Sequence, residues 1–553
     1  MLPARSLPVC CPEANDHRTA RYGYAVLRRL PLALLGGAAL FLAFPGHDLW
    51  LLAPVGVALL ALATTGAGIR RGALLGFAGA MVFFTESLSW SGVYVGALPW
   101  FALAVLQSLF VALLGGVCGR ATSDRARAGD PARGATPLRV RPLVVALAWV
   151  AQEALRDRLP YGGFPWVRLA FSQADSPFGR LAALGGAPMV TFAVGLAGGL
   201  LAAGVLRLVR SRPVPLRPTV GALALALLVG LAGLLVPLPT DGPPARVMAI
   251  QGNVPRAGLD FNSQRRQVLD NHVDGTLQGA AEVVNGTAQQ PDLVVWPENA
   301  SDIDPLRNSD AAAQITRAVE AIGAPVVVGT LLEQPAPDVS NVSLLYLPGR
   351  GLVQQYVKQH PVPFAEYIPD RAFFRLFSDK VDLVRADFAP GDRPVVFTVP
   401  AASGGQIHAG PTICFEVAYD SLVRDNVEQG ADLLLVQTNN ATFGFTNESV
   451  QQLAISRIRA MEHGRSIVHV STVGVSALIT PDGTAHQASA LFTRAVLSGE
   501  LPLRTARTLA TVVGAWPEYA ACLALLVLMS SRLLPPRRRV RSAPRPSMIE
   551  DPR

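Results

Sequence analysis

The sequence predicts a two-part fold, in which a bundle of membrane-spanning helices is joined to a layered α/β domain. Of the 553 residues, 50% are hydrophobic and only 16% are charged, which is too apolar for an ordinary water-soluble protein of this length. The apolar residues gather between about 24 and 239 in blocks long enough to cross a bilayer, and one more block follows near 514–533. Between them, short apolar runs alternate with amphipathic helical patterns, which is typical of an α/β fold.

Seven candidate spans precede the α/β part and an eighth follows it. They lie near residues 25–44, 49–67, 73–91, 98–118, 142–157, 188–206, 219–237 and 514–533. The fifth is short and contains Glu153, and the third contains Glu86. A carboxylate inside a membrane is costly, so we expect these two groups to pair with a partner or to serve a site.

Arginine clusters predict how the chain is oriented. If the N-terminus is cytoplasmic, the arginines before the first span, after the second, fourth and sixth spans, and after the eighth all fall on the cytoplasmic side. A minority falls on the other side and weakens this bias without reversing it: Arg156, Arg158, Arg168 and Arg180. The bias also accounts for the net charge of +8, so no nucleic-acid partner is expected.

These observations predict five segments. The chain is expected to begin with a cytoplasmic tail over 1–22, without a removable signal peptide, and to continue as a membrane domain over 23–240. Seven crossings then place an α/β domain over 244–503 outside the cytoplasm. A C-terminal span over 512–534 and a basic cytoplasmic tail over 535–553 complete the prediction.

Periodicity within the α/β domain predicts its helices and strands. Strands are expected over 246–251, 293–296, 325–329, 343–347, 352–357, 433–437, 466–471 and 476–479, and another ends at Ile413. Helices are expected over 264–284, 311–322, 419–429 and 449–463.

Three chemically useful residues stand where predicted strands end, which is where α/β folds place their sites. Glu298 ends the run Leu-Val-Val-Trp-Pro-Glu, Lys358 follows the strand over 352–357, and Cys414 follows Ile413. A thiol needs a base to become a nucleophile, and acyl transfer needs a donor for the developing oxyanion. A glutamate, a lysine and a cysteine supply these parts.

Each residue also has a structural interpretation. Cys414 is the only one of 5 cysteines in the polar half of the chain, so it has no disulfide partner or zinc-site neighbours there, but a small core residue is equally compatible with its stretch. Glu298 by itself is more simply a solvated carboxylate. Lys358 could be a surface lysine, but only two of the 48 basic residues are lysines. A chain that uses arginine almost everywhere favours a specific need for the compact ammonium group.

Two aromatic stretches have alternative interpretations. Between Tyr161 and Gln173 lies an aromatic loop, which by its pattern favours an interfacial belt at the membrane surface. The second stretch is an apolar cluster that could enter the outer leaflet or pack in a core: Phe373, Phe374, Leu376 and Phe377.

At its candidate site residues the chain resembles the nitrilase superfamily, and in its whole layout it resembles the apolipoprotein N-acyltransferase family. The motifs that carry the resemblance are Gly-Phe-Pro-Trp (163–166) with Ser172-Gln173, Gln251-Gly-Asn-Val-Pro255, Trp296-Pro-Glu298, Lys358 with Val362-Pro-Phe-Ala-Glu-Tyr367, Cys414-Phe-Glu416, Thr438-Asn-Asn440 with Phe443-Gly444, and Arg459-Ala-Met-Glu462. The resemblance implies that the α/β domain is an αββα sandwich.

The resemblance also implies roles for individual residues. Glu298 would be the general base, Lys358 the oxyanion stabiliser and Cys414 the nucleophile. Supporting roles would fall to Glu366, which helps to hold the lysine, and to Glu416 and Phe415, and lipid contacts would fall to Trp166 and Phe443. The chain departs from the family pattern at Phe415, where tyrosine is frequent, and at Thr442, where tryptophan is frequent.

The implied activity is an acyl transfer without metal or diffusible cofactor. The thiolate would take a fatty acyl group from a phospholipid as a thioester, and the α-amine of a lipoprotein's diacylglyceryl-cysteine would receive it. The expected partners are therefore a phospholipid donor, a diacylated apolipoprotein acceptor and membrane lipid, in a bacterial plasma membrane. A membrane-tethered amidase or nitrile hydrolase with the same triad is the main alternative, and a transporter or scaffold with a degenerate domain is the other.

Overall fold

The computed structural model describes residues 26–122, 139–210, 213–255 and 264–530. The predicted tails over 1–22 and 535–553 lie outside these ranges, as do the ends of the first and last predicted spans and part of the arginine-rich segment between the fourth and fifth.

A helical bundle contains a helix at each of the eight predicted spans. These are α2 (Leu30–Ala43), α3 (Leu52–Thr64), α4 (Gly68–Ser87), α5 (Ala97–Thr122), α6 (Pro142–Arg156), α7 (Ala182–Arg210), α8 (Leu216–Leu231) and α15 (Trp516–Ser530). By length and composition, three helical stretches of the described chain could cross a membrane: Ala97–Thr122, Gly179–Arg210 and Leu216–Leu235.

Two local features shape the bundle. Helices α4 and α5 approach closely through glycines, since a Cβ atom on Gly72 would lie 2.3 Å from the carbonyl oxygen of Gly115. Small residues at such a crossing allow tight packing between membrane helices. Helix α7 begins earlier than the predicted sixth span and is kinked at Gly185 and Gly186, where Gly186 has a φ of +70°. Pro188 follows directly and cannot donate a helical hydrogen bond.

The α/β part consists of two six-stranded sheets. The first has the order β12-β1-β2-β3-β4-β5, with bounds Ala495–Pro502, Pro244–Gln251, Leu293–Val295, Val326–Leu332, Ser340–Leu347 and Gly351–Val357. The second has the order β11-β10-β9-β8-β7-β6, with bounds Ala485–His486, Ala477–Ile479, Ser466–Ser471, Leu433–Thr438, Gln406–Ile413 and Phe397–Pro400. Each sheet has three parallel strands at its centre (β1–β3 and β7–β9) and antiparallel strands at its edges.

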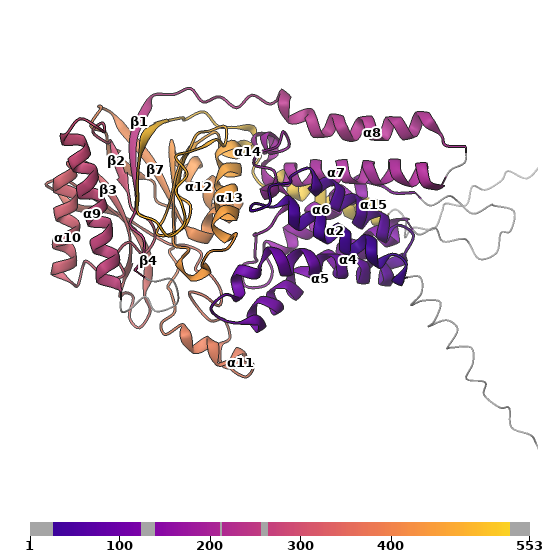
Figure 1. The fold of residues 1–553 in the computed structure, drawn as a ribbon, viewed down its shortest axis with the longest axis horizontal. Helices are drawn as coiled ribbons and strands as arrows, with labels where there is room; N and C mark the ends of the chain where they lie inside the picture. The colour runs from indigo at the N-terminus through magenta and orange to yellow at the C-terminus, as the bar shows by residue number, and fades with distance from the viewer. Residues whose placement is uncertain (1–25, 123–138, 211–212, 256–263, 531–553) are drawn as a thin grey trace, which may run out of the picture.

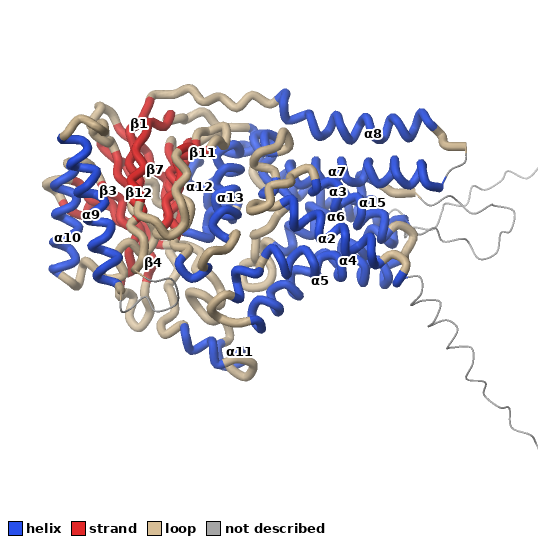
Figure 2. Tube along the Cα trace, in the orientation of Figure 1, coloured by secondary structure: helices blue, strands red, loops and turns tan. Residues whose placement is uncertain are grey.

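The two sheets face each other across one apolar core and are covered by helices on their outer faces (Figures 1 and 2). Helices α9 (Arg265–Val284) and α10 (Ser309–Ile322) cover the first sheet, and α12 (Asp420–Glu428) and α13 (Glu448–His463) cover the second. This arrangement is the expected αββα sandwich, so the predicted fold is confirmed.

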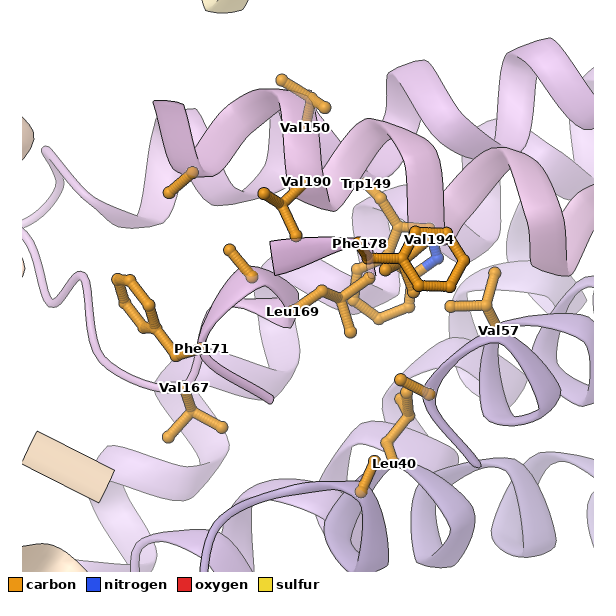
Figure 3. Close-up of a cluster of buried hydrophobic side chains, with 14 of the residues drawn as sticks. Leu40, Val57, Trp149, Val150, Val167, Leu169, Phe171, Phe178, Val190 and Val194 are labelled. Carbon is orange, nitrogen blue, oxygen red and sulfur yellow. The ribbon is translucent and has the colours of Figure 1, made fainter. Parts of the chain in front are cut away.

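The helix layer of the second sheet also packs against the helical bundle. Buried residues of α13, such as Ile455 and Met461, belong to the same apolar cluster as residues of α2, α3, α6 and α7. Figure 3 shows the bundle side of this cluster, where Leu40, Val57, Trp149, Leu169 and Val194 converge from different helices. The second sheet is therefore the side of the sandwich that faces the bundle.

Among the strands and α-helices of the described residues, five were not predicted from the sequence. They are the strands β6, β11 and β12 and the short helices α11 (Arg371–Phe374) and α14 (Leu509–Val513). The strand β12 contains Ser498 and Gly499, which weaken the apolar pattern expected of a strand. It nevertheless pairs along its full length with β1. Pairing with a distant strand therefore stabilises β12, although its local periodicity does not predict a strand.

Candidate active site

The three predicted residues meet at one end of the sandwich. Glu298 comes just after β2 and Lys358 directly after β5, both in the first sheet. Cys414 directly follows β7 in the second sheet. The facing sheets bring the ends of these strands together, as expected for a site at strand ends.

Lys358 lies between two carboxylates. Its Nζ is 3.3 Å from Glu298 Oε1 and 2.8 Å from Glu366 Oε1, and the residue is only 1% exposed. Asn341 lies between the same carboxylates, since its Nδ2 donates to Glu298 Oε1 (2.7 Å) and to Glu366 Oε1 (3.1 Å). The backbone N–H of Val362 fixes the other oxygen of Glu366 (2.7 Å). The lysine is therefore not a surface residue, and Glu298 is not a solvated carboxylate.

The electrostatics of this cluster suit proton transfer. Burial raises the pKa of Glu298, although Lys358 acts in the opposite direction. Burial alone would lower the pKa of Lys358, but the carboxylates of Glu366 and Glu298 raise it above its ordinary value. The lysine therefore keeps its charge, while the glutamate is a stronger base than a solvated carboxylate.

Cys414 begins the short helix η6 (Cys414–Ala418) with a φ of +56°. Non-glycine residues rarely adopt this left-handed conformation, which costs of order 1–3 kcal/mol and is frequent at functional sites. Thr438 Oγ1 lies 3.4 Å from the sulfur and Gln452 Nε2 lies 3.8 Å from it. Burial and the charge of Glu298 raise the pKa of the Cys414 thiol above its ordinary value, although Lys358 acts in the opposite direction.

Glu416 connects the strand ends that carry the lysine and the cysteine. Its carboxylate accepts hydrogen bonds from the backbone N–H of Ile413 (2.7 Å), Gln359 (2.7 Å) and His360 (3.1 Å), and from the hydroxyl of Tyr356 (2.9 Å). Because the buried Glu416 carboxylate accepts from donors at both strand ends, it fixes the end of β5 relative to the end of β7. Glu416 therefore acts on the geometry of the site through the backbone.

The aromatic loop of the bundle packs on the residue after the nucleophile. Trp166 is buried and its ring stacks on Phe415, with centroids 5.3 Å apart and an interplanar angle of 5°. Phe443 contacts Trp90 (5.0 Å), which in turn contacts Trp166 (5.8 Å). The interpretation of this loop as an interfacial belt is therefore wrong for Trp166, because the catalytic part of the chain covers it.

The two carboxylates of the spans differ in their surroundings. Glu153 is buried and accepts from the backbone N–H of Leu169 (2.9 Å) and from Thr191 Oγ1 (2.7 Å), with Arg168 Nε 3.6 Å away. Glu86 is exposed near the end of α4. The expected pairing therefore holds for Glu153 only.

Several residues near the site were not assigned a role from the sequence. They are Asn341, Tyr356, Asn440, Glu448 and Gln452. Asn440 lies in a motif of the resemblance, but the other four lie within strands or a helix where spacing gives no signal. Among the described residues, no group of three or more His, Cys, Asp and Glu could hold a metal ion.

The fold and this cluster define a carbon–nitrogen hydrolase domain. The family model described as carbon-nitrogen hydrolase matches residues 263–511, and the one described as apolipoprotein N-acyltransferase N-terminal domain matches residues 36–200. A solved amidase from Nesterenkonia sp. is 18% identical with a TM-score of 0.33, over 50% of this chain and 95% of its own.

Curated relatives extend the match over almost the whole chain. An apolipoprotein N-acyltransferase from Mycolicibacterium smegmatis is 38% identical over 95% of this chain and 90% of its own length. One from Azotobacter vinelandii is 32% identical over 94% of this chain and 97% of its own. The chain belongs to the apolipoprotein N-acyltransferase family.

Proposed function

We propose that this protein transfers a fatty acyl group from a membrane phospholipid, through a thioester on Cys414, to the N-terminal amine of a diacylglyceryl-cysteine on apolipoproteins. The observation that carries the proposal is the placement of the Cys414 segment between a buried base and lysine on one side and the aromatic loop of an apolar helical bundle on the other. A site beside such a bundle suits two lipid substrates.

In the first step, the Cys414 thiolate attacks the ester carbonyl carbon of the phospholipid. Glu298 takes the thiol proton, and Lys358 donates to the oxyanion of the tetrahedral intermediate. When the intermediate collapses, the C–O ester bond breaks and the lysophospholipid alkoxide receives the proton from Glu298. The products are a Cys414 thioester and a lysophospholipid.

In the second step, the α-amine of the acceptor attacks the thioester carbonyl. Glu298 takes a proton from the amine, the C–S bond breaks, and Cys414 leaves as a thiolate. The raised pKa of Glu298 suits both proton transfers, because a carboxylate with the ordinary pKa of glutamate would be a weaker base. Glu366 and Glu416 position the lysine and the cysteine, and Phe415 supports the site beside the buried ring of Trp166. Of the two residues expected to contact lipid, Trp166 and Phe443, only Phe443 is partly exposed.

The helical bundle is proposed to lie within the membrane, and the sandwich outside the cytoplasm. The membrane domain would cover 23–240 with about seven crossings, the catalytic domain 244–503 would be extracytoplasmic, and a last span over 512–534 would return the chain to the cytoplasm. The arginine bias supports this arrangement.

The segment around α11 supports contact of the catalytic domain with lipid. Phe373, Leu376 and Phe377 are 54%, 79% and 65% exposed. Tyr161 of the aromatic loop contacts Phe374 in the same segment, with ring centroids 6.3 Å apart. An exposed apolar segment beside the bundle suits insertion into a leaflet.

Intact-mass measurement of the purified protein tests the proposal. After incubation with phospholipid, the wild-type protein is expected to gain one acyl mass that neutral hydroxylamine removes, and Cys414→Ala is expected to gain none. A diacylated peptide with a free N-terminus should then discharge the adduct. An adduct that persists in Cys414→Ala would contradict the assignment, and equally fast discharge by water would favour an amidase-type hydrolase.

A further inference from the structure

A second group of polar residues surrounds the Cys414 sulfur, apart from the lysine–carboxylate cluster. It consists of Thr438, Asn440, Glu448, Gln452 and Ser471, all of which are buried. We call it the thiol-side network. Its members come from the ends of β8 and β9, from the turn after β8, and from α13.

The hydrogen bonds of this network fix the direction of both amides. Ser471 Oγ accepts from the backbone N–H of Gly474 (2.7 Å) and donates to Asn440 Oδ1 (2.5 Å). Asn440 therefore presents its Nδ2 to the opposite side, where it donates to Glu448 Oε2 (2.7 Å) and Gln452 Oε1 (2.9 Å).

Gln452 Oε1 accepts a second hydrogen bond from Thr438 Oγ1 (2.7 Å), and this shorter contact uses the single hydroxyl proton, so Thr438 does not also donate to the sulfur at 3.4 Å. Since the oxygen of this amide is held by two donors, its Nε2 must face the other way, and there it meets Cys414 Sγ at 3.8 Å. A donor that lies against the reacting sulfur with a fixed orientation is preorganised, and needs no rearrangement when charge develops there.

The charges that face the sulfur explain why a neutral donor is useful. The carboxylates of Glu298 and Glu448 act on the sulfur, and Lys358 is the cation that opposes them. Glu366 and Glu416 act on the lysine. Burial raises the pKa of Glu448 to about 8, so at neutral pH this group is mainly protonated and adds little negative charge. An amide N–H stabilises a thiolate without placing a second cation beside the base.

We infer that Gln452 is a further catalytic residue, whose amide N–H donates to the Cys414 sulfur whenever that sulfur carries negative charge. Such charge exists before attack on the phospholipid and again when the thiolate leaves in the second step. Thr438, Asn440 and Ser471 are positioning residues that hold the amide in this direction. The inference rests on the proposed nucleophile Cys414, but it concerns the ionisation of the thiol and not the identity of the acyl acceptor.

The pH dependence of thiol alkylation tests this inference. The full-length protein in detergent is treated with iodoacetamide between pH 6 and 12, and peptide mass spectrometry follows the rate at Cys414. For Gln452→Met, which keeps the size of the side chain but lacks the donor, we expect the midpoint to rise by about one to two pH units with an unchanged plateau rate at high pH. Gln452→Leu, which also lacks the donor and adds no charge, should raise it by a similar amount and decides the test if Gln452→Met does not fold.

Gln451→Met is the matched control. Gln451 is the neighbouring residue, is also buried, and contacts Trp90, Trp166 and the carbonyl oxygen of Ser87 in place of the sulfur. Its variant should leave the midpoint unchanged. An unmoved midpoint in the Gln452 variants, a rate reduced equally at every pH, or the same shift in Gln451→Met would each overturn the inference. Wild-type protein that gains no acyl group from phospholipid would contradict the proposed function and leave the alkylation result intact.

Discussion

Lys358 is held by two carboxylates and has almost no contact with solvent. An arginine side chain carries the same charge but ends in a broad planar guanidinium group, which does not fit the space between Glu298 and Glu366. We expect Lys358→Arg to slow formation of the acyl-enzyme by roughly 10²–10³-fold, the usual loss for one oxyanion donor. Lys380 is exposed, so Lys380→Arg should behave as wild type. Normal thioester formation in Lys358→Arg would remove the lysine from the mechanism.

Glu448 makes the stability of the protein depend on pH. Burial raises its pKa from 4.5 to about 8. Between these pH values the unfolded chain loses the proton while the folded protein keeps it, so the stability that this group contributes is complete below about pH 4.5 and is lost as the pH rises to about 8. Glu448→Gln should therefore raise the thermal midpoint relative to wild type more at pH 8 than at pH 5. Glu500→Gln on the exposed face of β12 is the control, and an equal effect of Glu448→Gln at both pH values would contradict the argument.

At the scale of elements, α12 and α13 connect the sandwich to the bundle through a chain of ion pairs. Arg168 of the aromatic loop pairs with Asp420 at the start of α12 (2.7 Å), which also pairs with Arg459 of α13 (2.5 Å). Arg459 in turn donates to the carbonyl oxygens of Val417 (2.9 Å) and Ala418 (2.7 Å), three and four residues after the nucleophile. The position of Cys414 is thereby linked to the bundle.

Removing Arg168 should destabilise this junction strongly. In Arg168→Met the carboxylates of Glu153, Asp157 and Asp420 lose their shared partner, and an uncompensated buried charge typically costs about 3–5 kcal/mol. Thermal unfolding in detergent measures the loss. Asp175→Asn, which breaks the exposed pair with Arg457 at the same junction, should cost at most about 1 kcal/mol. Equal losses of stability in the two variants would contradict a larger contribution of the Arg168 ion pairs.

At the scale of the whole molecule, the arginines that oppose the charge bias all have structural partners. Arg156 donates to the carbonyl oxygen of Trp166 (2.5 Å), Arg158 pairs with Glu518 (2.5 Å), and Arg180 donates to the carbonyl oxygen of Val236 (2.8 Å). With Arg168 paired to Asp420, each of the four has a role in the folded protein that accounts for an arginine at its position. We therefore expect reporter fusions near residues 130 and 260 to give opposite signals, and matching signals would contradict the proposed orientation.

The sequence by itself determined the two-part architecture, most strands and helices of the sandwich, and the three residues at strand ends. These features follow from local information, because hydrophobic periodicity and the end of an apolar run depend only on neighbouring residues. The rarity of lysine pointed to Lys358 in the same way. Its position between Glu298 and Glu366 agrees with that inference.

Only the tertiary structure decided the contacts between distant segments. The pairing of β12 with β1 joins strands at opposite ends of the sandwich domain, and the stacking of Trp166 on Phe415 joins the bundle to the site. The direction of the Gln452 amide depends on Asn440, Ser471 and Thr438, which come from different strands and turns. Spacing along the chain carries no information about such contacts, because the direction of a hydrogen bond and the burial of a ring are properties of the packed fold.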